Sequence, residues 1–478
     1  MGLVVMKFGG TSVGTAERIQ HSARLVQREA GRHRTVVVVS ALAGVTDVIL
    51  KSVEAAQRDD AAEVEAGLRE LEARHEAVLH DLFPDGAAAP REQVGAVLRQ
   101  FRDFCSALLL LRSATPQVLD VALPMGERMA AHIFTAVLHQ LGARSEYVDS
   151  SRVLVTDDRF GDASPEMEAT RRQTKAFLLP LVEAGVIPVV TGYSGATHKG
   201  QPTTLGRGGS DSSATILGAA LGCAEVWIWT DVDGVMTADP RICPDARTLS
   251  EITFGEAVEL SYYGAKVIHH KAIRPAMEGG IPVWIRNSFK PEVPGTRIAA
   301  SVAASGSPVK AVSALTPASL VTVTARRDIH FAEVFGRLFL RLGHEHVDVL
   351  FSTQSSSENS LGLVLRAQDT EQVFGAICRL FRMELKHGVL DPITVHNNIA
   401  VISVLGESMK GTCGILGRLF AAVASANQSV IAVAQGASEL NICFAVDSVG
   451  AAAVVRAVHQ EFIAGGKTAT PAGRHPLS

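Results

Sequence analysis

Residues 3–12 read LVVMKFGGTS, an apolar run that leads directly into a lysine, two glycines and two hydroxyl side chains. The run Leu3–Met6 predicts a buried strand, and a helical pattern follows Ser12. Adjacent glycines let backbone N–H groups approach a ligand closely, because no Cβ stands in the way. The N-terminus of the next helix adds a partial positive charge. With Lys7 beside it, this turn suits a polyphosphate, although an ordinary strand–turn–helix connection would have the same glycine pair.

The composition is that of a soluble globular protein with several domains. The chain has 478 residues, of which 47% are hydrophobic and 20% charged. A net charge of −4 gives no reason to expect nucleic acid or a membrane surface as a partner. Six scattered cysteines predict reduced, buried thiols. We expect a cytoplasmic protein, because the sequence has no apolar run of membrane-spanning length and no signal-peptide pattern at its N-terminus.

Strands and helices alternate through the first three hundred residues. Helical patterns such as Ala16–Arg28 and the long charged stretch Lys51–Leu111 separate runs typical of buried strands. This alternation predicts a layered α/β domain with a mainly parallel central sheet. The segment Phe289–Pro308 is rich in proline, glycine and small residues, which predicts a linker. The predicted strands are Thr35–Val39, Val186–Thr191, Val226–Thr230 and Ile281–Ile285.

Beyond this linker the chain repeats itself with an offset of 81 residues. Gly336–Phe339 recurs as Gly417–Phe420, and Gln354 corresponds to Gln435. Each copy has the pattern strand, helix, strand, strand, helix, so the sequence predicts two copies of one α+β unit. A sheet of this size buries little surface alone, and we expect the copies to pack on each other or on a second chain.

A second glycine-rich loop, Leu205–Ser213, lies between an extended segment and a helix. Its three glycines, Arg207 and Asp211 predict another anion site, although a helix with a serine or aspartate cap would share part of this pattern. Farther along, Asp231 ends a predicted strand, at the edge where open α/β sheets bind ligands. Lys266 supplies another cation. No Walker-type motif and no protein-kinase signature is present, so we predict a nucleotide site of another kind.

Taken together, these motifs resemble the aspartate kinases, which have the amino-acid-kinase fold. The resemblance extends from about residue 3 to residue 463, and the repeated unit is similar to the paired ACT (ferredoxin-like) modules of that family. The sequences of the motifs in the repeated unit are most similar to those in the kinase half of bifunctional aspartate kinase–homoserine dehydrogenases. We expect a monofunctional kinase because no dehydrogenase half follows. The motifs are KFGGTSV at 7–13, Gly126-Glu127, Leu205–Asp211, Trp229–Gly234 and Gly264–Val267.

The resemblance implies transfer of a phosphoryl group from ATP, with Mg²⁺, to the β-carboxylate of L-aspartate. This reaction gives 4-phospho-L-aspartate and is the first step of lysine, threonine and methionine biosynthesis. Carried over by position, Lys7 and Asp211 are the implied catalytic residues, with Asp211 orienting Lys7. The implied aspartate-binding residues are Ser40, Thr46, Glu127, Arg207 and Ser210. The implied nucleotide-binding residues are Lys7, Phe8, Gly9, Gly10, Thr230, Asp231, Met236, Arg241, Lys266 and Val267; no resident metal site is implied.

Two positions depart from the family pattern. Met236 stands where a tyrosine is usual. Because a thioether can still pack on a purine, we expect this change to affect the affinity for ATP and not the activity itself. His269-His270 replaces the usual His-Pro, and we interpret these histidines as structural, because neighbours on a helix point in different directions.

The resemblance also implies feedback regulation by an amino acid that binds the ACT modules of a homodimer. Gln354 and Gln435 match positions associated with threonine sensing, whereas residues 326–335 are more similar to lysine-sensing members, and we slightly favour threonine. Another acyl-phosphate-forming enzyme of the fold, acting on glutamate or a carbamate, and a catalytically silent amino-acid sensor are the alternatives. The implied domains are 1–298 (catalytic), 299–312 (linker), 313–395 and 396–463 (ACT modules) and 464–478 (a disordered tail).

Overall fold

The computed structural model describes residues 2–86, 88–264, 268–303, 307–326, 331–345 and 347–465. It has two compact units. The first consists of Met1–Val235, Ser250–Phe254 and Val267–Val302, and the second of Met236–Leu249, Gly255–Lys266 and Ala303–Ser478. Two segments that precede residue 298 in the sequence therefore belong to the second unit. The domain boundaries predicted from the sequence assume that each domain is one continuous segment, and they stay predictions. Nearly all of the predicted tail (464–478), and residues 327–330 of the first predicted ACT module, lie outside the described residues.

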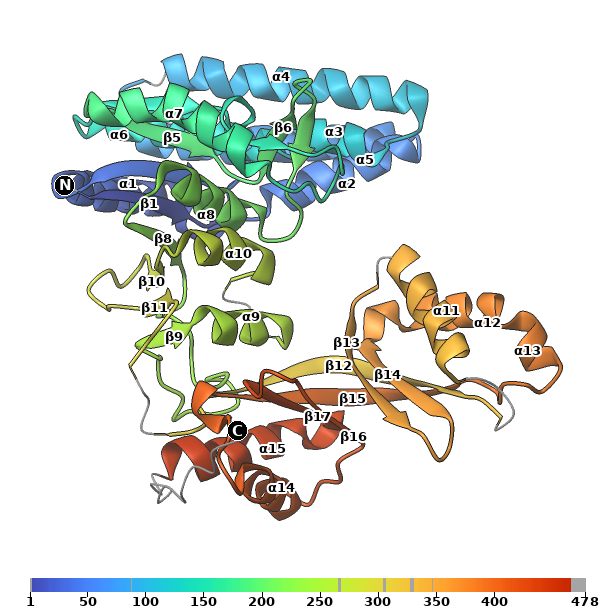
Figure 1. Ribbon diagram of the computed structural model, residues 1–478. Helices are drawn as coiled ribbons and strands as arrows, with labels where there is room; N and C mark the ends of the chain where they lie inside the picture. Colours follow the sequence, from blue (N-terminus) through green and yellow to red (C-terminus); the bar gives the residue numbers. More distant parts are fainter. Residues whose placement is uncertain are drawn as a thin grey trace. The chain divides into compact units, whose positions relative to one another are not determined.

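The first unit is built on an eight-stranded sheet in the order β3-β5-β2-β1-β8-β10-β11-β9 (Figure 1). All neighbouring strands are parallel except β10 and β11, which are antiparallel. A smaller sheet has the order β4-β6-β7. The strands are β1 (Leu3–Phe8), β2 (Arg34–Val39), β3 (Ser145–Val148), β4 (Val155–Thr156), β5 (Ile187–Thr191), β6 (Ser194–Thr197), β7 (Pro202–Thr204), β8 (Glu225–Thr230), β9 (Glu251–Thr253), β10 (Val283–Asn287) and β11 (Thr296–Ala299).

The strand order follows from the apolar runs of the sequence. The valines of β2, Val36 to Val39, are all fully buried, as expected for a central strand covered on both faces. The prediction of a mainly parallel α/β sheet is confirmed, and the five predicted strands, Leu3–Met6 included, are β1, β2, β5, β8 and β10. Since β1 has β2 on one side and β8 on the other, the strand order reverses beside β1. Open α/β sheets bind ligands at such a point.

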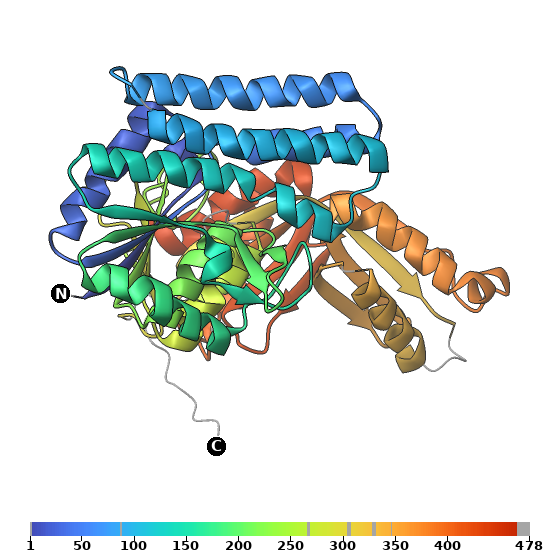
Figure 2. The same ribbon diagram turned by 90° about the horizontal axis from the view of Figure 1, so that it is seen from above.

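Helices cover this sheet, and two long ones, α3 and α4, run side by side in Figure 2. The charged stretch Lys51–Leu111 forms most of α2 and all of α3 and α4, with Pro84 and Gly86 in the break between the last two. Pro90 lies in the first turn of α4, where its missing N–H has no helical partner to lose. The helices are η1 (Gly10–Val13), α1 (Ala16–Ala30), α2 (Val45–Gln57), α3 (Ala61–Leu82), α4 (Ala88–Leu111), α5 (Pro116–Ala122), α6 (Met125–Gln140), η2 (Ser150–Arg152), α7 (Met167–Glu183), α8 (Gly209–Leu221) and α10 (His270–Gly279).

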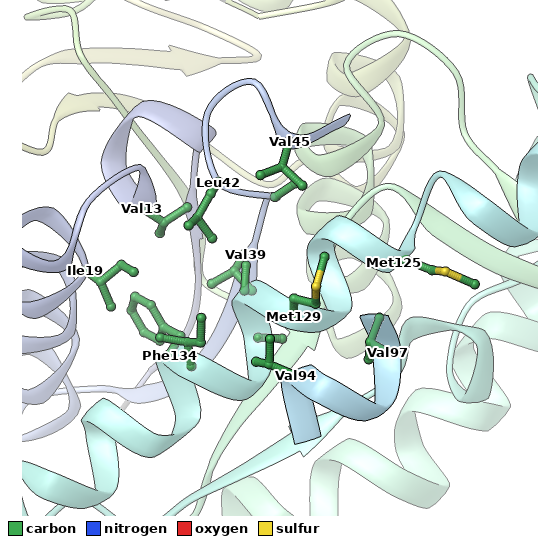
Figure 3. Close-up of a cluster of buried hydrophobic side chains, with 14 of the residues drawn as sticks. Val13, Ile19, Val39, Leu42, Val45, Val94, Val97, Met125, Met129 and Phe134 are labelled. Atoms are coloured by element: carbon green, nitrogen blue, oxygen red, sulfur yellow. The ribbon is translucent and has the colours of Figure 1, made fainter. Parts of the chain in front are cut away.

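The apolar core between the sheet and its helices fixes the position of α6, which carries Glu127 (Figure 3). Gly126 is required at this contact, because a Cβ there would lie 2.8 Å from Ala41 Cβ. The side chains labelled in Figure 3 are Val13, Ile19, Val39, Leu42, Val45, Val94, Val97, Met125, Met129 and Phe134.

The predicted linker Phe289–Pro308 is only partly irregular. Strand β11 lies inside it and pairs antiparallel with β10 at the sheet edge. Gly295 permits this turn, since its φ is +82° and a Cβ would collide with the carbonyl of Ile285. The sequence pattern did not predict β11, because its four residues lie among prolines and small residues.

The second unit has a six-stranded sheet in the order β13-β14-β12-β15-β17-β16. Two βαββα copies form it, which confirms the repeat, and they join through the antiparallel pair β12 and β15. The two copies therefore share one continuous sheet. Its elements are α9 (Phe254–Tyr262, all but its first residue), β12 (Ala311–Thr324), α11 (Phe331–His344), β13 (Val349–Ser355), β14 (Ser360–Arg366), η3 (Ala367–Asp369), α12 (Thr370–Leu380), α13 (Arg382–Lys386), β15 (Thr394–Leu405), η4 (Glu407–Met409), α14 (Ile415–Ser425), β16 (Ala432–Gln435), β17 (Asn441–Asp447), η5 (Ser448–Gly450), α15 (Ala451–His459) and the π-helical turn η6 (Gln460–Ala464).

Helix α9 is attached to this sheet by a buried ion pair. Glu256 Oε2 accepts a hydrogen bond from Lys310 Nζ at 2.9 Å, and both side chains are buried. The other oxygen of Glu256 accepts from the backbone N–H of Glu407 at 2.9 Å. Tyr263, just after the helix, donates its hydroxyl to the carbonyl of Leu350 at 3.0 Å. One short helix thus contacts both βαββα copies.

Replacing Lys310 with methionine should destabilise the second unit by about 3 kcal/mol, because it leaves the Glu256 carboxylate buried without its cation. All three tryptophans lie in the first unit, so intrinsic tryptophan fluorescence would not report on the unfolding of the second unit. Hydrogen exchange of α9 and β12 is the suitable measurement. The matched control is Arg99→Ala, which removes an exposed ion pair with Glu92 and should cost less than about 1 kcal/mol. Equal exchange rates in the two variants would contradict this role of Lys310.

The cysteines are free, and four of the six are buried as predicted. The prediction is wrong for Cys378, which is half-buried, and for Cys413, which is exposed. Within the described part of the chain, no helix has both the length and the apolar character needed to cross a membrane.

Candidate active site

Three predicted site residues lie at the carboxyl ends of adjacent parallel strands. Lys7 is the penultimate residue of β1, Ser40 follows β2, and Thr230 ends β8. The backbone N–H of Ser40 donates to the carbonyl of Phe8 at 3.1 Å, which continues the pairing of β1 and β2 by one step. These side chains therefore gather at the edge where the strand order reverses.

Lys7 is held by a carboxylate from a distant part of the chain. Its Nζ lies 2.5 Å from Asp211 Oδ1, and the Lys7 residue is only 8% exposed. Asp211 lies in the first turn of α8, where the helix dipole favours a negative charge. This ion pair fixes the direction of the ammonium group, as expected for an orienting role of Asp211.

The glycine pair differs in detail from a simple cradle of free N–H groups. The Gly9 N–H donates to the carbonyl of Trp229 at 3.1 Å and is not available to a ligand. Gly10 begins the 3₁₀ turn η1, whose first N–H groups have no helical partner, whereas the longer helix α1 begins only at Ala16. A Cβ on Gly10 would lie 3.0 Å from the carbonyl oxygen of Ala41. Gly10 is thus needed for close packing against the Ala41 backbone as well as for the access of a ligand to the backbone N–H groups.

Phe8 has its side chain in the core, fully buried and stacked on Trp229 with ring centroids 6.1 Å apart. Any contact between Phe8 and a nucleotide would therefore come from its backbone.

The second glycine-rich loop makes a tight turn into α8. Gly206 and Gly208 have φ of +69° and +70°, which only glycine adopts readily. A Cβ on Gly208 would also lie 2.5 Å from His269 Cβ. Arg207, between the two glycines, is exposed and forms no ion pair with any residue that the structure describes. The turn thus presents a guanidinium group that is free to bind a carboxylate.

Ser40 and Ser210 are brought together from sites 170 residues apart. Their hydroxyl oxygens lie 2.9 Å from each other, so Ser40 contacts the first turn of α8 and caps no helix. Thr46 is the second residue of α2 and is half-buried, and the residue at the cap position is Gly44. Ser40 is thus brought to the first turn of α8, which also carries Asp211.

Glu127 is buried, although a glutamate in the first turn of a helix is most often exposed. It is 3% exposed, and burial raises the pKa of its carboxyl group to about 8, while hydrogen bonds from the Ala41 and Glu127 backbones and the charge of Lys7 act in the opposite direction. Its Oε2 has no hydrogen-bond partner among the described residues. A buried carboxylate oxygen without a partner is costly, so this atom is suited to receive an ammonium group from a ligand.

The predicted nucleotide side is divided between the two units. Thr230 donates its hydroxyl to Asp231 Oδ1 at 3.2 Å in the first unit. In the second unit, Met236 Sδ accepts from the Thr248 hydroxyl at 3.3 Å, and Arg241 pairs with Asp239 at 2.6 Å. Lys266 and Val267 lie outside the described residues. Their assignment to the nucleotide stays a prediction.

Sequence reasoning missed Tyr193, which has a φ of +73°. Bulky residues rarely adopt this left-handed conformation, and such strain is typical of functional sites. The Tyr193 N–H donates to Ser213 Oγ at 3.0 Å, and its carbonyl accepts from Leu205 N–H at 2.9 Å. Tyr193 thus links both ends of the Arg207 loop. The only sequence signal was a glycine, Gly192, directly after a predicted strand.

His269 has a structural contact, as the sequence suggested. Its Nδ1 accepts from the Lys271 N–H at 3.4 Å at the start of α10, and burial, followed by the charges of His270, Lys271 and Arg207, lowers its pKa to about 4. Across the described residues, no group of three or more His, Cys, Asp or Glu side chains is arranged to hold a metal ion.

Gln354 and Gln435, the predicted effector residues, occupy equivalent places in the two copies. Gln354 is on β13 and Gln435 on β16, the two edge strands of the second sheet, and both are exposed.

Comparison with known proteins gives the family. Residues 2–287 match the amino acid kinase family, and residues 402–462 match the ACT domain. Over 469 residues the chain is 30% identical to lysine-sensitive aspartokinase 3 of Escherichia coli, a match that covers 96% of this chain and 98% of that protein. The chain belongs to the aspartokinases of the amino acid kinase family.

Other aspartokinases match over nearly the whole chain. A chloroplastic bifunctional aspartokinase/homoserine dehydrogenase 1 of Zea mays is 33% identical over 465 residues, which cover 96% of this chain and 50% of that protein. The chain thus spans about half the length of such bifunctional relatives. The crystal structure of E. coli aspartokinase III with aspartate and ADP, described as the R-state, matches with a TM-score of 0.83 and 29% identity, covering 96% of this chain and 99% of that one. The lysine and aspartate complex in the T-state has a TM-score of 0.79 over the same shares of both chains.

Proposed function

We propose that this chain transfers the γ-phosphoryl group of ATP to the side-chain carboxylate of L-aspartate, giving ADP and 4-phospho-L-aspartate. The observation that carries the proposal is the buried Oε2 of Glu127, which has no partner among the described residues and lies in the field of Lys7. An amino-acid substrate would supply the missing ammonium group. The relatives support aspartate as that substrate, since the similar E. coli structure holds aspartate and ADP.

The proposed reaction needs cations in the site and needs no histidine as a base. A carboxylate with a pKa of about 4 is already ionised at neutral pH, so the nucleophile needs no proton acceptor. The obstacle is the approach of one anion to another. Lys7, held in place by Asp211, would neutralise the charge that develops on the transferred group.

The substrate would be bound by groups of opposite charge. Arg207 would hold the α-carboxylate of aspartate as a bidentate partner, and Glu127 would hold its ammonium group. Ser40, Thr46 and Ser210 would supply hydroxyl groups around the side-chain carboxylate.

ATP would bind beside Lys7, with backbone contacts from residues 8–10. Thr230, Asp231, Met236, Arg241, Lys266 and Val267 would complete the nucleotide side. We expect Mg²⁺ to enter with ATP, since this ion is usually held by substrate phosphates and water with few protein ligands. When bound, it would neutralise phosphate charge.

The test is an ATP-dependent hydroxamate assay with L-aspartate and L-glutamate in parallel. We expect aspartyl hydroxamate from L-aspartate and at least about tenfold less product from L-glutamate, because an extra methylene displaces the reacting carboxylate. An enzyme that forms the hydroxamate only from glutamate, or forms none, would refute the proposal.

We further propose that an amino acid binds the second unit of a homodimer and inhibits the kinase. Lysine is supported by the lysine-sensitive E. coli relative, and threonine by Gln354 and Gln435. Measuring the kinase rate with each amino acid alone distinguishes the two, and an unchanged rate with both would exclude this regulation. The molecular mass of the protein in solution, measured by analytical sedimentation, tests whether it forms a dimer.

A further inference from the structure

Asp120 is a buried acid that the reaction above does not use. It lies on α5, seven residues before Glu127, and is fully buried. Burial raises the pKa of its carboxyl group, although hydrogen bonds from Thr204 and Gly161 oppose the shift. None of the ion pairs found among the described residues includes Asp120. A buried carboxyl group without a cation is costly, so its contacts must compensate.

Those contacts join three separate segments. Asp120 Oδ1 accepts from the Thr204 hydroxyl at 2.6 Å, and Oδ2 accepts from the Gly161 N–H at 2.8 Å. The Thr204 carbonyl in turn accepts from the Ala163 N–H at 2.9 Å. The end of β7 and the loop around Gly161 are therefore both tied to α5.

The hydrogen bonds of Asp120 hold the chain directly before the tight turn at residues 206–208, which is called the Arg207 turn below. Thr204 is the last residue of β7, three positions before Arg207, and the next residue, Leu205, donates its N–H to the Tyr193 carbonyl at 2.9 Å. Arg207 is exposed and has no ion-pair partner among the described residues, so nothing from its own side chain fixes the turn. The direction of the guanidinium group depends on the backbone that leads into it.

A second contact places Tyr193 in the same network. Burial raises the pKa of the Tyr193 phenol, a side-chain hydrogen bond with Thr204 opposes this shift, and the charges of Glu127 and Asp120 contribute to it. Asp120 and the Tyr193 phenol therefore share a hydrogen-bond partner, the Thr204 side chain.

We propose that Asp120 is a positioning residue for the amino-acid substrate. It holds the end of β7, and with it the Arg207 turn, at a fixed place relative to the α5–α6 segment that carries Glu127. Asp120 thereby sets the distance between the group that binds the substrate carboxylate and the group that binds its ammonium, without touching the substrate. This inference rests on the proposed function for the identity of the substrate.

The variants are chosen so that the test does not depend on one substitution. Asp120→Ala removes both hydrogen bonds, whereas Asp120→Asn can still accept from Gly161 and donate to the Thr204 oxygen. Thr204→Val removes the link from the other side. The matched controls are Glu29→Ala, which changes another buried acid of the first unit, and Thr174→Val, which changes another buried threonine. The Thr174 hydroxyl donates to the carbonyl of Thr170 instead of to a carboxyl group.

The first measurement is steady-state kinetics with each substrate varied separately. We expect Asp120→Ala and Thr204→Val to raise the KM for L-aspartate about tenfold or more, because small displacements of binding groups have large effects, while the KM for ATP changes less than about twofold. Asp120→Asn should recover most of this loss. A purely structural role would lower the amount of active enzyme, or affect both substrates equally, and either result would overturn the proposal.

The second measurement needs no substrate. Hydrogen exchange of residues 203–213 should be faster in Asp120→Ala and Thr204→Val than in the wild type and both controls. Unchanged exchange in this segment would also overturn the proposal. If the wild type does not phosphorylate aspartate, the proposed function fails, and the exchange experiment still decides whether Asp120 holds the turn.

Discussion

Replacing Lys7 with alanine should lower kcat by about 10³-fold, with a much smaller change in the KM for L-aspartate. The reason is that the ammonium group of Lys7 lies near the carboxyl end of the central strand β1 and is held there by an ion pair, 2.5 Å from Asp211. Its charge is needed most when two anions approach each other in the transition state. Stopped-time assays of aspartyl hydroxamate give kcat directly.

The control for Lys7 is Lys51→Ala, which removes an exposed lysine from α2 and should leave kcat within about twofold of the wild type. Asp211→Asn should also lower kcat, because the lysine loses its orienting partner, but less than removal of the lysine itself. A Lys7→Ala enzyme with more than a tenth of the wild-type kcat would be incompatible with the assigned role.

Replacing Glu127 with glutamine should lower kcat/KM for L-aspartate by about 10³-fold, since one partner of a buried charge pair is removed. Glutamine keeps the size of the side chain and a carbonyl oxygen for the Ala41 N–H, so the loss reports mainly on charge. The control is Glu146→Gln, which changes an exposed glutamate on β3. If the loss appears in the KM for ATP instead, Glu127 does not bind the amino acid.

The pH dependence gives an independent check on Glu127. Burial raises the pKa of its carboxyl group to about 8, so in the free enzyme this group is mostly protonated at neutral pH. An ammonium group binds the ionised form, and kcat/KM reports on the free enzyme. The value of kcat/KM for L-aspartate should therefore rise about tenfold per pH unit below pH 8 and level off above it. In Glu127→Gln this rise should be absent, and a persisting rise would assign the titration to another group.

Much of the fold follows from local patterns in the sequence. Glycine pairs, β-branched runs and the 81-residue repeat predict the strands, the turns and the two βαββα copies, because each pattern expresses a backbone or burial requirement of its own segment. The same patterns predict Lys7, which lies in the segment with Gly9 and Gly10, and Arg207, which stands between two glycines of positive φ. Strand β11 was missed because its four residues lie among prolines and small side chains.

The partners of the site residues could not be predicted in this way. The pairing of Lys7 with Asp211 joins positions 204 apart, and the resemblance to a family suggested it where the spacing could not. The burial of Glu127 depends on Gly126 packing against Ala41, and nothing in the α6 sequence itself indicates this contact. Asp120 and Tyr193 carry no motif at all. Their importance arises from hydrogen bonds to segments between about ten and eighty residues away.

The division of the chain into its two units has a practical consequence for anyone who wishes to study the kinase portion in isolation. Met236–Leu249 and Gly255–Lys266 precede residue 298, yet Ala238 and Cys243 belong to the core of the second βαββα copy, and Tyr263 packs with strands of both copies. A fragment that ends at residue 298 would expose these apolar side chains to water and invite aggregation. The sheet of the second unit therefore shields apolar side chains of the segments before residue 298 from water, and truncation at that residue would remove this cover.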